Sequence, residues 1–492
     1  MTTAPAQIGR VKPKSPRRLS AEADRAPGSL NARYDAAQTT KDNELYWANA
    51  DNLSARAANS PGVRQILRRR ARYETDNNCY ADGMLQTHAD YVVGTGPKLQ
   101  LLTEDEEFNE AVEQAFFAWA KRVKLGRKLW QMRYGWAQDG ESFAMFKTNL
   151  ALDHPVKLDL ETFEPEQISD GVMFNAGINR TDGMVLDDFG NVSAYKVLPQ
   201  HPGDARLLSS SLTPDLVPAR DMIHLMRTKR ARQLRGVPEI TPALMIYPIL
   251  RRYTLAMLYN AETSARVSGV IRSQQSPDDP DDLEPLDPVE LGFNEWMTLP
   301  AGWNIEQFKS QQPNAEYAPF KKEVIREIAR CMKMPYVIAA ADSSGHNFAS
   351  GKLDHTTYFK SVGIDQTSIT DDAADPTFER WYQEAIRIPG YLPAPPSGDR
   401  STPAHDWIYD GQELLDPREA NAQAVAAGHG LDSIPRQHAK RGLRTDQVMR
   451  ANAKALGITV EEYQKMLRSK YYDVPLAPDT ADEASDNAND NG

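Results

Sequence analysis

The segment from Gly345 to Lys352 is the part of this sequence nearest to a phosphate-binding loop. Such a loop needs four residues between its glycines, then Lys, then a Ser or Thr whose hydroxyl holds magnesium. Here five residues separate Gly345 from Gly351, and Leu353 follows Lys352. Because the magnesium-binding hydroxyl is missing, the pattern argues against nucleotide binding.

Other chemical patterns are also incomplete. Gly94-Thr95-Gly96 lacks the third glycine of a dinucleotide fingerprint and is interpreted as a turn. Seven acidic residues and no basic one lie between Asp278 and Glu290 without the spacing of a calcium loop, which predicts an exposed loop. His224 lies in an apolar strand-like segment and is interpreted as a packed residue. Since no nucleophile elbow or zinc motif is found either, we expect no catalytic site, no metal and no cofactor.

Two segments could still contact a ligand. The run from 227 to 235 carries Arg227, Lys229 and Arg230, which could meet phosphates or pair with an acidic neighbour. The small-residue segment 339–351 is either a flexible connector or a surface loop with a function.

Composition sets limits on the class of protein. The 492 residues carry a net charge of −11, whereas proteins that grip DNA tightly are usually basic, so any DNA contact is expected to be weak and local. Cys79 and Cys331 suggest neither a disulfide framework nor a zinc site, which favours a reducing compartment. No apolar run is long enough to span a membrane, and none follows the basic N-terminus as a secretory signal would require.

The first half of the chain predicts an α+β region after a flexible basic arm at 1–44. Residues 45–92 read as helical, with apolar residues beside an arginine-rich face around 63–73 and a glycine turn at the end. Residues 105–135 form an amphipathic helical stretch, in which Phe108, Val112, Phe116 and Trp119 recur at three- and four-residue steps. Between 140 and 225 the pattern alternates as in strands, for example at 142–146 and 193–197 with a turn at 187–191, so the fold class is α+β and mainly helical.

The second half predicts mostly helices. Residues 238–266 form a long helix with Thr241 as N-cap, Pro242 at the first position and a kink at Pro248. This helix is so apolar that other helices must bury it, either from the same chain or from neighbouring subunits. Further helices are expected at 316–332, where Pro335 stops the helix, at 352–388 and within 415–470, with starts at 443–446 and 458–462. Residues 390–403 form a boundary, and the acidic tail from 474 is expected to be disordered.

In their order along residues 30–450, these segments resemble the portal proteins of lambda-like tailed phages. Phe348 and Ala349 depart from the family, which commonly has Tyr and Ser there. The matching segments are Arg68-Arg69-Arg70-Ala71-Arg72 with Asn77-Asn78, Val93-Gly94-Thr95-Gly96, Gly140-Glu141-Ser142-Phe143, Gly177-Ile178, Asp187 to Tyr195, Val217 to His224, Gln233 to Pro238 and Asn347 to Lys352.

The resemblance implies a portal fold around a central channel, in a ring that is a dodecamer and sits at one capsid vertex. Its regions would be a wing at 45–237, stem helices at 238–266 and 316–335, a clip at 267–315, a tunnel loop with a long wing helix at 336–403, and a helical crown at 404–473, followed by the tail at 474–492.

The resemblance also implies a non-enzymatic channel for packaging and ejecting double-stranded DNA. Its partners would be the terminase motor, the major capsid or scaffold protein and head-completion adaptors, and its location the virion, with the host cytoplasm during assembly. DNA-facing tunnel-loop residues would be Ser343, Ser344, His346, Asn347 and Lys352, and DNA or subunit contacts would come from Arg227, Lys229 and Arg230. The alternatives are a nuclease or terminase-like ATPase, and another minor capsid protein.

Overall fold

The chain divides into two units, Met1–Ser54 and Ala55–Gly492. In the first unit, residues 43–49 form turns and residues 50–54 have no regular secondary structure, with the N–H of Tyr46 donating to Asn43 and that of Ala50 donating to Trp47. The expectation of a helix from residue 45 is therefore wrong as far as Ser54. The computed structural model describes residues 41, 43–170, 182–204, 213–266, 270–273, 303–306, 316–345, 348–396, 398, 400–411, 422, 425–426 and 432–471.

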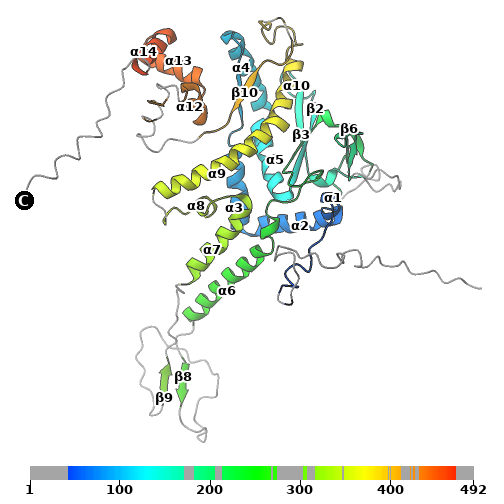
Figure 1. Ribbon diagram of the computed structural model, residues 1–492, viewed down its shortest axis with the longest axis vertical. Helices are drawn as coiled ribbons and strands as arrows, with labels where there is room; N and C mark the ends of the chain where they lie inside the picture. Colours follow the sequence, from blue (N-terminus) through cyan, green and yellow to red (C-terminus); the bar gives the residue numbers. More distant parts are fainter. Residues whose placement is uncertain are drawn as a thin grey trace, which may run out of the picture. The chain divides into compact units, whose positions relative to one another are not determined.

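The second unit confirms the mainly helical α+β class (Figure 1). Its helices are α1 (Ala55–Ala58), α2 (Pro61–Asn77), α3 (Cys79–Val92), α4 (Glu106–Val123), α5 (Leu125–Asp139), α6 (Ile246–Arg266), α7 (Tyr317–Ala329), α8 (Tyr336–Ala339), α9 (Phe348–Ile369), α10 (Asp375–Ala385), α12 (Ile434–Lys440), α13 (Thr445–Leu456) and α14 (Val460–Tyr471). Its strands are β1 (Lys98–Leu101), β2 (Glu141–Thr148), β3 (Leu158–Phe163), β4 (Met184–Leu186), β5 (Val192–Val197), β6 (Asp215–Pro218), β7 (Met222–Met226), β8 (Val270–Ser273), β9 (Trp303–Glu306) and β10 (His405–Ile408).

The strands form small antiparallel sheets. In the described residues these have the orders β3-β2-β7, β4-β5-β6, β1-β10 and β8-β9. Phe143 of β2 lies opposite Phe163 of β3 and His224 of β7. Because β10 pairs with β1 from Lys98↔Ile408 to Leu101↔His405, the expectation that 404–473 is helical is wrong for its first residues.

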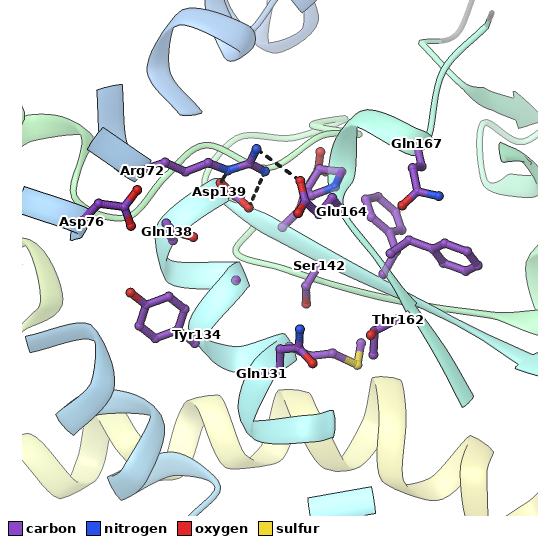
Figure 2. Close-up of a pocket in the computed structure, with 16 residues that line it drawn as sticks. Arg72, Asp76, Gln131, Tyr134, Gln138, Asp139, Ser142, Thr162, Glu164 and Gln167 are labelled. Atoms are coloured by element: carbon purple, nitrogen blue, oxygen red, sulfur yellow. Dashed lines mark hydrogen bonds and ion pairs between the residues drawn. The ribbon is translucent and has the colours of Figure 1, made fainter. Parts of the chain in front are cut away.

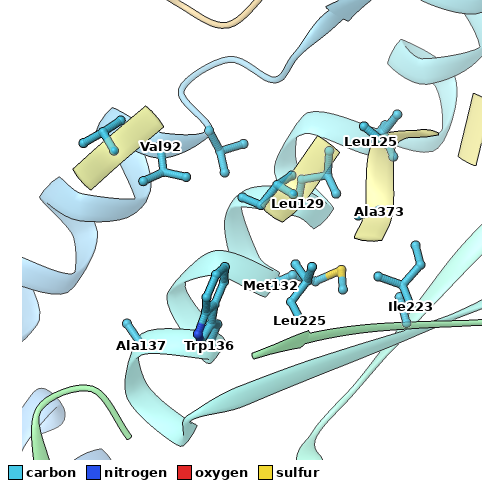
Figure 3. Packing of buried hydrophobic residues seen from close by; sticks show 14 of the residues in the cluster. Val92, Leu125, Leu129, Met132, Trp136, Ala137, Ile223, Leu225 and Ala373 are labelled. Atoms are coloured by element: carbon cyan, nitrogen blue, oxygen red, sulfur yellow. The ribbon is translucent and has the colours of Figure 1, made fainter. Parts of the chain in front are cut away.

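The main core lies between α5 and the helices and strands around it. Trp119, Trp136 and Trp381 are fully buried. Figure 3 shows Met132 of α5 beside Leu225 and Ile223 of β7, with Leu129 one turn away. The predicted stripe of Phe108, Val112, Phe116 and Trp119 is buried on α4, which confirms that amphipathic helix.

Strand β2 separates two cores because successive side chains point to opposite faces. Ala144 and Phe146 enter the main core, whereas Phe143 joins a second cluster with Tyr195 and Met222. The predicted strands around 142–146 and 193–197 and the turn at 187–191 are all present.

Helix α2 buries two of its arginines and exposes two of its apolar residues. Arg64 and Arg68 are buried, whereas Val63 and Ile66 are 42% and 49% exposed. The arginine-rich face therefore packs inward, because carboxylates from distant parts of the chain meet it there, as the site below describes.

Helix α6 begins later than predicted. Residues Thr241–Ala243 form a separate 3₁₀ turn, and the Thr241 hydroxyl donates to the Pro238 carbonyl instead of capping a helix. Since α6 starts at Ile246, Pro248 lies in its first turn, where a missing N–H costs no helical hydrogen bond. The expected kink at Pro248 and the N-cap at Thr241 are therefore wrong.

The other predicted helices are confirmed with shifted ends, except that within 415–470 residues 415–421, 423–424 and 427–431 lie outside the described residues. The region 352–388 becomes α9 and α10, joined by a π-helical turn at Thr370–Ala374. Helix α14 starts at the predicted capping box, in which the Thr459 N–H donates to Glu462 Oε2 at 2.9 Å and the Glu462 N–H donates to Thr459 Oγ1 at 3.2 Å. Within the described part of the chain, no helix is both long and apolar enough to cross a membrane.

Candidate functional site

Helices α6 and α7 lie side by side (Figure 1) and hold each other through aromatic side chains. Tyr253 of α6 meets Tyr317 and Phe320 of α7 at ring-centroid distances of 5.6 and 5.3 Å. Near the N-terminal end of α6, Tyr247 and Leu250 are buried in the main core. The pair is thus anchored at one end and extends away from the core at the other.

Large apolar side chains are exposed on α6 and at Met245, which precedes it. Their exposed fractions are 70% for Met245, 64% for Ile249, 46% for Leu255, 62% for Leu258 and 64% for Tyr259. Large apolar side chains that remain exposed along several turns of one helix mark a contact surface for another protein. The sequence expectation that other helices bury α6 is therefore met only in part within a single chain.

The segment between α8 and α9 is tied to α7. Lys322 and Arg326 of α7 lie over the ring of Tyr336, at 4.9 and 5.6 Å. The Tyr336 hydroxyl donates to Asp342 at 3.3 Å, and Asp342 also accepts from the N–H and hydroxyl of Ser344. These hydrogen bonds lower the pKa of Asp342, the bonds from Ser344 most of all. The start of this loop therefore has a defined shape.

The loop predicted at 339–351 is shorter in the structure. Ala339 ends α8, and Phe348 begins α9, so the segment 339–351 is a loop only in its middle. Ser343 and Ser344 are exposed in the loop, and Lys352 is exposed in the first turns of α9. His346 and Asn347 lie outside the described residues.

The basic run after β7 forms a turn around Gln233. The Gln233 side chain accepts from the N–H of Lys229 at 3.0 Å and donates to the carbonyl of Arg235 at 3.0 Å. Lys229 and Arg230 are exposed, whereas Arg227 and Arg235 turn inward to carboxylates. Of the two interpretations of this run, pairing with an acidic neighbour holds for Arg227. Contact with phosphates stays open for the exposed Lys229 and Arg230.

Arg227 belongs to a buried ionic cluster that we call the α9 junction. It joins Arg227 with Arg133 of α5, His88 of α3, Glu239 before α6, and Asp365 of α9. Arg133 reaches Glu239 at 2.9 Å and Asp365 at 2.8 Å, and Arg227 reaches the same two carboxylates at 2.7 and 2.6 Å. The His88 ring donates from Nε2 to Asp365 at 3.1 Å. The junction fixes α9 to the segment that leads into α6.

The pKa values of Asp365 and His88 in the α9 junction are both lowered. Burial alone would raise the pKa of Asp365, but the hydrogen bond from His88 and the charges of Arg133 and Arg227 outweigh it, so the pKa lies far below its ordinary value. Burial lowers the pKa of His88, and Arg133 lowers it further. His88 is therefore neutral, and its Nδ1 accepts from the Tyr358 hydroxyl at 2.6 Å.

The neutral His88 should make the subunit less stable in mild acid. Because its folded-state pKa is below the unfolded value of about 6.5, its stabilising effect is complete above that pH and is lost as pH falls, by up to about 1.4 kcal/mol per pH unit. We expect His88→Gln to flatten the decline in melting temperature between pH 7 and pH 5, with His355→Gln on α9 as the control. An unchanged slope in His88→Gln would contradict this assignment.

A second buried cluster, the Glu141 junction, lies at the start of β2. Glu141 is fully buried and accepts from Arg68, from Arg235 at 2.8 Å, from His224 at 3.1 Å and from the N–H of Gly236 at 2.8 Å. Burial would raise its pKa, but the charges of Arg235 and Arg68 outweigh it, so the pKa lies well below its ordinary value. His224 is therefore a packed partner of Glu141, as the sequence predicted for a strand residue.

Two glycines allow this junction to close. Gly140 has φ of +91°, and a side chain there would lie 2.3 Å from the carbonyl carbon of Val237. A side chain at Gly236 would lie 2.0 Å from the Gly140 carbonyl oxygen. Because only glycine has no Cβ, both positions require it for the close approach of the two backbones.

Sequence reasoning did not find either junction. The arginines of α2 were visible as a run, but their partners lie far away in the chain, at Asp139, Glu141, Glu166 and Asp182. The only available signal was that Arg64, Arg68 and Arg72 recur every four residues and so share one helix face.

A match to a known protein family identifies the family of this chain. Residues 42–363 match the family described as "Phage portal protein, lambda family". A "Probable portal protein" of Halomonas phage phiHAP-1 is 24% identical over 459 residues, which cover 86% of this chain and 87% of the relative. Among solved structures, "Neck of native GTA particle computed with C12 symmetry" has a TM-score of 0.46 at 14% identity, over 78% of this chain and 94% of the other. "Neck of empty GTA particle computed with C6 symmetry" has a TM-score of 0.45 with the same identity and coverage.

Proposed function

This chain belongs to the lambda family of phage portal proteins, and from that premise we propose that its copies close into a ring whose channel carries double-stranded DNA. The family resemblance implies twelve copies at one capsid vertex. In this proposal α6 and α7 are the stem helices, residues 45–237 the wing, and residues 404–473 the crown. Residues 267–315, of which only β8 and β9 are described, would be the clip.

The observation that carries the ring is the set of exposed apolar side chains on and just before α6. Five large side chains, Met245, Ile249, Leu255, Leu258 and Tyr259, remain exposed in the single chain. Each is worth about 1.5–3 kcal/mol when it is removed from water. Neighbouring copies related by rotation would bury these side chains, and a head-to-tail contact repeated by a closing rotation gives a ring.

DNA would meet the ring at small polar and basic groups. We assign Ser343, Ser344, His346, Asn347 and Lys352 to the channel side, with Lys229 and Arg230 as further phosphate contacts. The acidic net charge of −11 suits a conduit, because strong attraction for phosphates would slow a sliding duplex.

The remaining roles follow from the same family premise. The subunit would be a non-enzymatic platform that docks the terminase motor, the major capsid or scaffold protein and the head-completion adaptors. It would assemble in the host cytoplasm and remain in the virion. A nuclease, a terminase-like ATPase or another minor capsid protein would be the alternative. An assay for metal-dependent nuclease activity or for ATP hydrolysis distinguishes the first two from a portal protein.

Native mass spectrometry and electron microscopy of the purified chain test the ring. We expect a species close to twelve times 55.0 kDa, and views down its axis that show a central hole. A chain that stays monomeric at micromolar concentration, or that forms an open filament, would contradict the proposal.

Replacing Lys352 with Ala should impair DNA packaging more than ring assembly. The side chain is exposed near the loop that we place at the channel, so its loss removes a phosphate contact without removing a packed residue. The measurement is the DNA content of particles made with the variant, with ring yield determined in parallel. Particles that fill normally would refute the assignment of Lys352.

A further inference from the structure

A polar cavity of about 550 Å³ lies in the wing, apart from the helices that we assign to the channel. Helices α2 and α5 form one side, and β2, β3 and the 3₁₀ turn Pro165–Gln167 form the other (Figure 2). Gly135 of α5 opens space across from Ser142, because a Cβ there would lie 3.6 Å from the Ser142 Cβ. The cavity is large enough for a small organic molecule.

Its inner wall offers hydrogen-bond acceptors that nothing in the described chain uses. Ser142 is 6% exposed, and its hydroxyl, which lines the cavity, has no partner among the described residues. The Gln138 amide donates to the Thr75 hydroxyl, which itself donates to the Arg72 carbonyl, so the Gln138 side-chain oxygen is left as an acceptor. The Gln167 amide donates to the Leu198 carbonyl at 3.2 Å and leaves its oxygen in the same way.

The rim carries more negative than positive charge. Arg72 binds Asp139 through two hydrogen bonds of 2.8 Å and also reaches Glu164 at 3.3 Å and Glu166 at 3.0 Å, so one cation faces three carboxylates. Asp76 also lines the cavity and has no ion-pair partner in the described part of the chain. An anionic ligand would therefore be repelled here, and a cation attracted.

The kind of cation follows from the rest of the lining. Tyr134 lines the cavity, and aromatic faces attract ammonium and guanidinium groups. These groups also supply several N–H donors and no acceptor, which complements the unused oxygens. We propose that the cavity binds an organic cation that bears primary ammonium or guanidinium groups.

A bare metal ion fits less well. Glu164, Glu166 and His201 place ligand atoms within 4.8 Å of one another, but Arg72 already lies against both glutamates. His201 Nδ1 accepts from the N–H of Gly203 at 3.0 Å, so the neutral ring carries its proton on Nε2, the nitrogen that faces Glu164 at 3.2 Å. A protonated nitrogen cannot coordinate a metal.

Calorimetric titration of the full chain with spermidine tests the proposal, and the Asp76→Asn and Glu164→Gln variants remove charge from the rim. We expect saturable one-site binding that is at least tenfold weaker in each variant and unchanged in Glu107→Gln, which alters an exposed acid on α4. Ser142→Val should also weaken binding, because it fills space and removes an acceptor. The proposal would be overturned if spermidine showed no saturable binding, or if Asp76→Asn and Glu164→Gln bound it as tightly as the unmodified chain does. Tighter binding of Mg²⁺ alone that spermidine does not displace would also overturn it.

The natural source of the cation is either a free polyamine or a lysine side chain of a second copy. Carbodiimide coupling in a mixture of isotopically light and heavy chains distinguishes the two. A bond between Asp76 or Glu164 and a lysine of the other copy assigns a second chain, whereas coupling only to added spermidine assigns a free polyamine. Because both readouts use wing residues, failure here would leave the ring proposal untouched.

Discussion

Glu141→Gln is expected to lower the free energy of unfolding of the subunit by about 3–5 kcal/mol, the range for a buried ion pair that loses one partner. The Glu141 carboxylate is fully buried and faces the guanidinium groups of Arg68 and Arg235, whose exposed fractions are each 4%. Glutamine keeps the shape of the side chain but leaves those two buried charges uncompensated. The measurement is the shift in the midpoint of urea unfolding followed by tryptophan fluorescence.

The matched control is Glu161→Gln on β3. Glu161 pairs with Lys147 across the β2–β3 ladder, but both side chains are about half exposed, so the change should stay within about 0.5 kcal/mol. Adding Arg68→Met to Glu141→Gln should recover part of the lost stability, because it removes one of the uncompensated charges. Equal effects of the two glutamine variants would contradict the role of the Glu141 junction.

Ile249→Asp combined with Leu258→Asp is expected to abolish ring assembly while the subunit remains folded. Both side chains are more than 60% exposed in the single chain, so an aspartate at either position meets water in the monomer. In the ring each aspartate would be buried without a partner, which costs several kcal/mol at each site. The contact recurs around the ring, so every interface would be weakened.

Native mass spectrometry at a series of protein concentrations measures this effect. We expect the double variant to remain monomeric where the unmodified chain forms rings, with circular dichroism and melting temperature close to unmodified values. Phe189→Asp is the control, because Phe189 is 90% exposed at the tip of the β4–β5 turn. Rings of the double variant at the same concentration would show that these two side chains of α6 are not in the contact.

The sequence alone was sufficient where a few neighbouring residues decide the outcome. The capping box at Thr459 and Glu462 fixes the start of α14, and the spacing from Phe108 to Trp119 fixes the buried face of α4. The turn at 187–191 is held by Asp187 itself, whose side chain accepts from the N–H groups of Phe189 and Asn191. The ordered series of short motifs was also enough to identify the portal family.

Only the tertiary structure decided which charged residues are buried. Helical periodicity places Val63 and Ile66 on one side of α2 and Arg64 and Arg68 on the other, and burial of the apolar side is the usual outcome. Here the arginines are buried, because Glu141 and Asp182 come to them from distant parts of the chain. A charge can leave water only where an opposite charge and hydrogen bonds meet it, and that meeting depends on the whole fold.

The candidate site was likewise predictable from the sequence only in part. The sequence located the basic run and the small-residue loop but could not show that Arg227 turns inward to Glu239 and Asp365 while Lys229 and Arg230 remain exposed. It also could not show the cavity behind Ser142, which exists because Gly135, two strands and a 3₁₀ turn come together. Local sequence determines helices, turns and caps because their hydrogen bonds span a few residues, whereas ion pairs and cavities form between segments that only folding brings into contact.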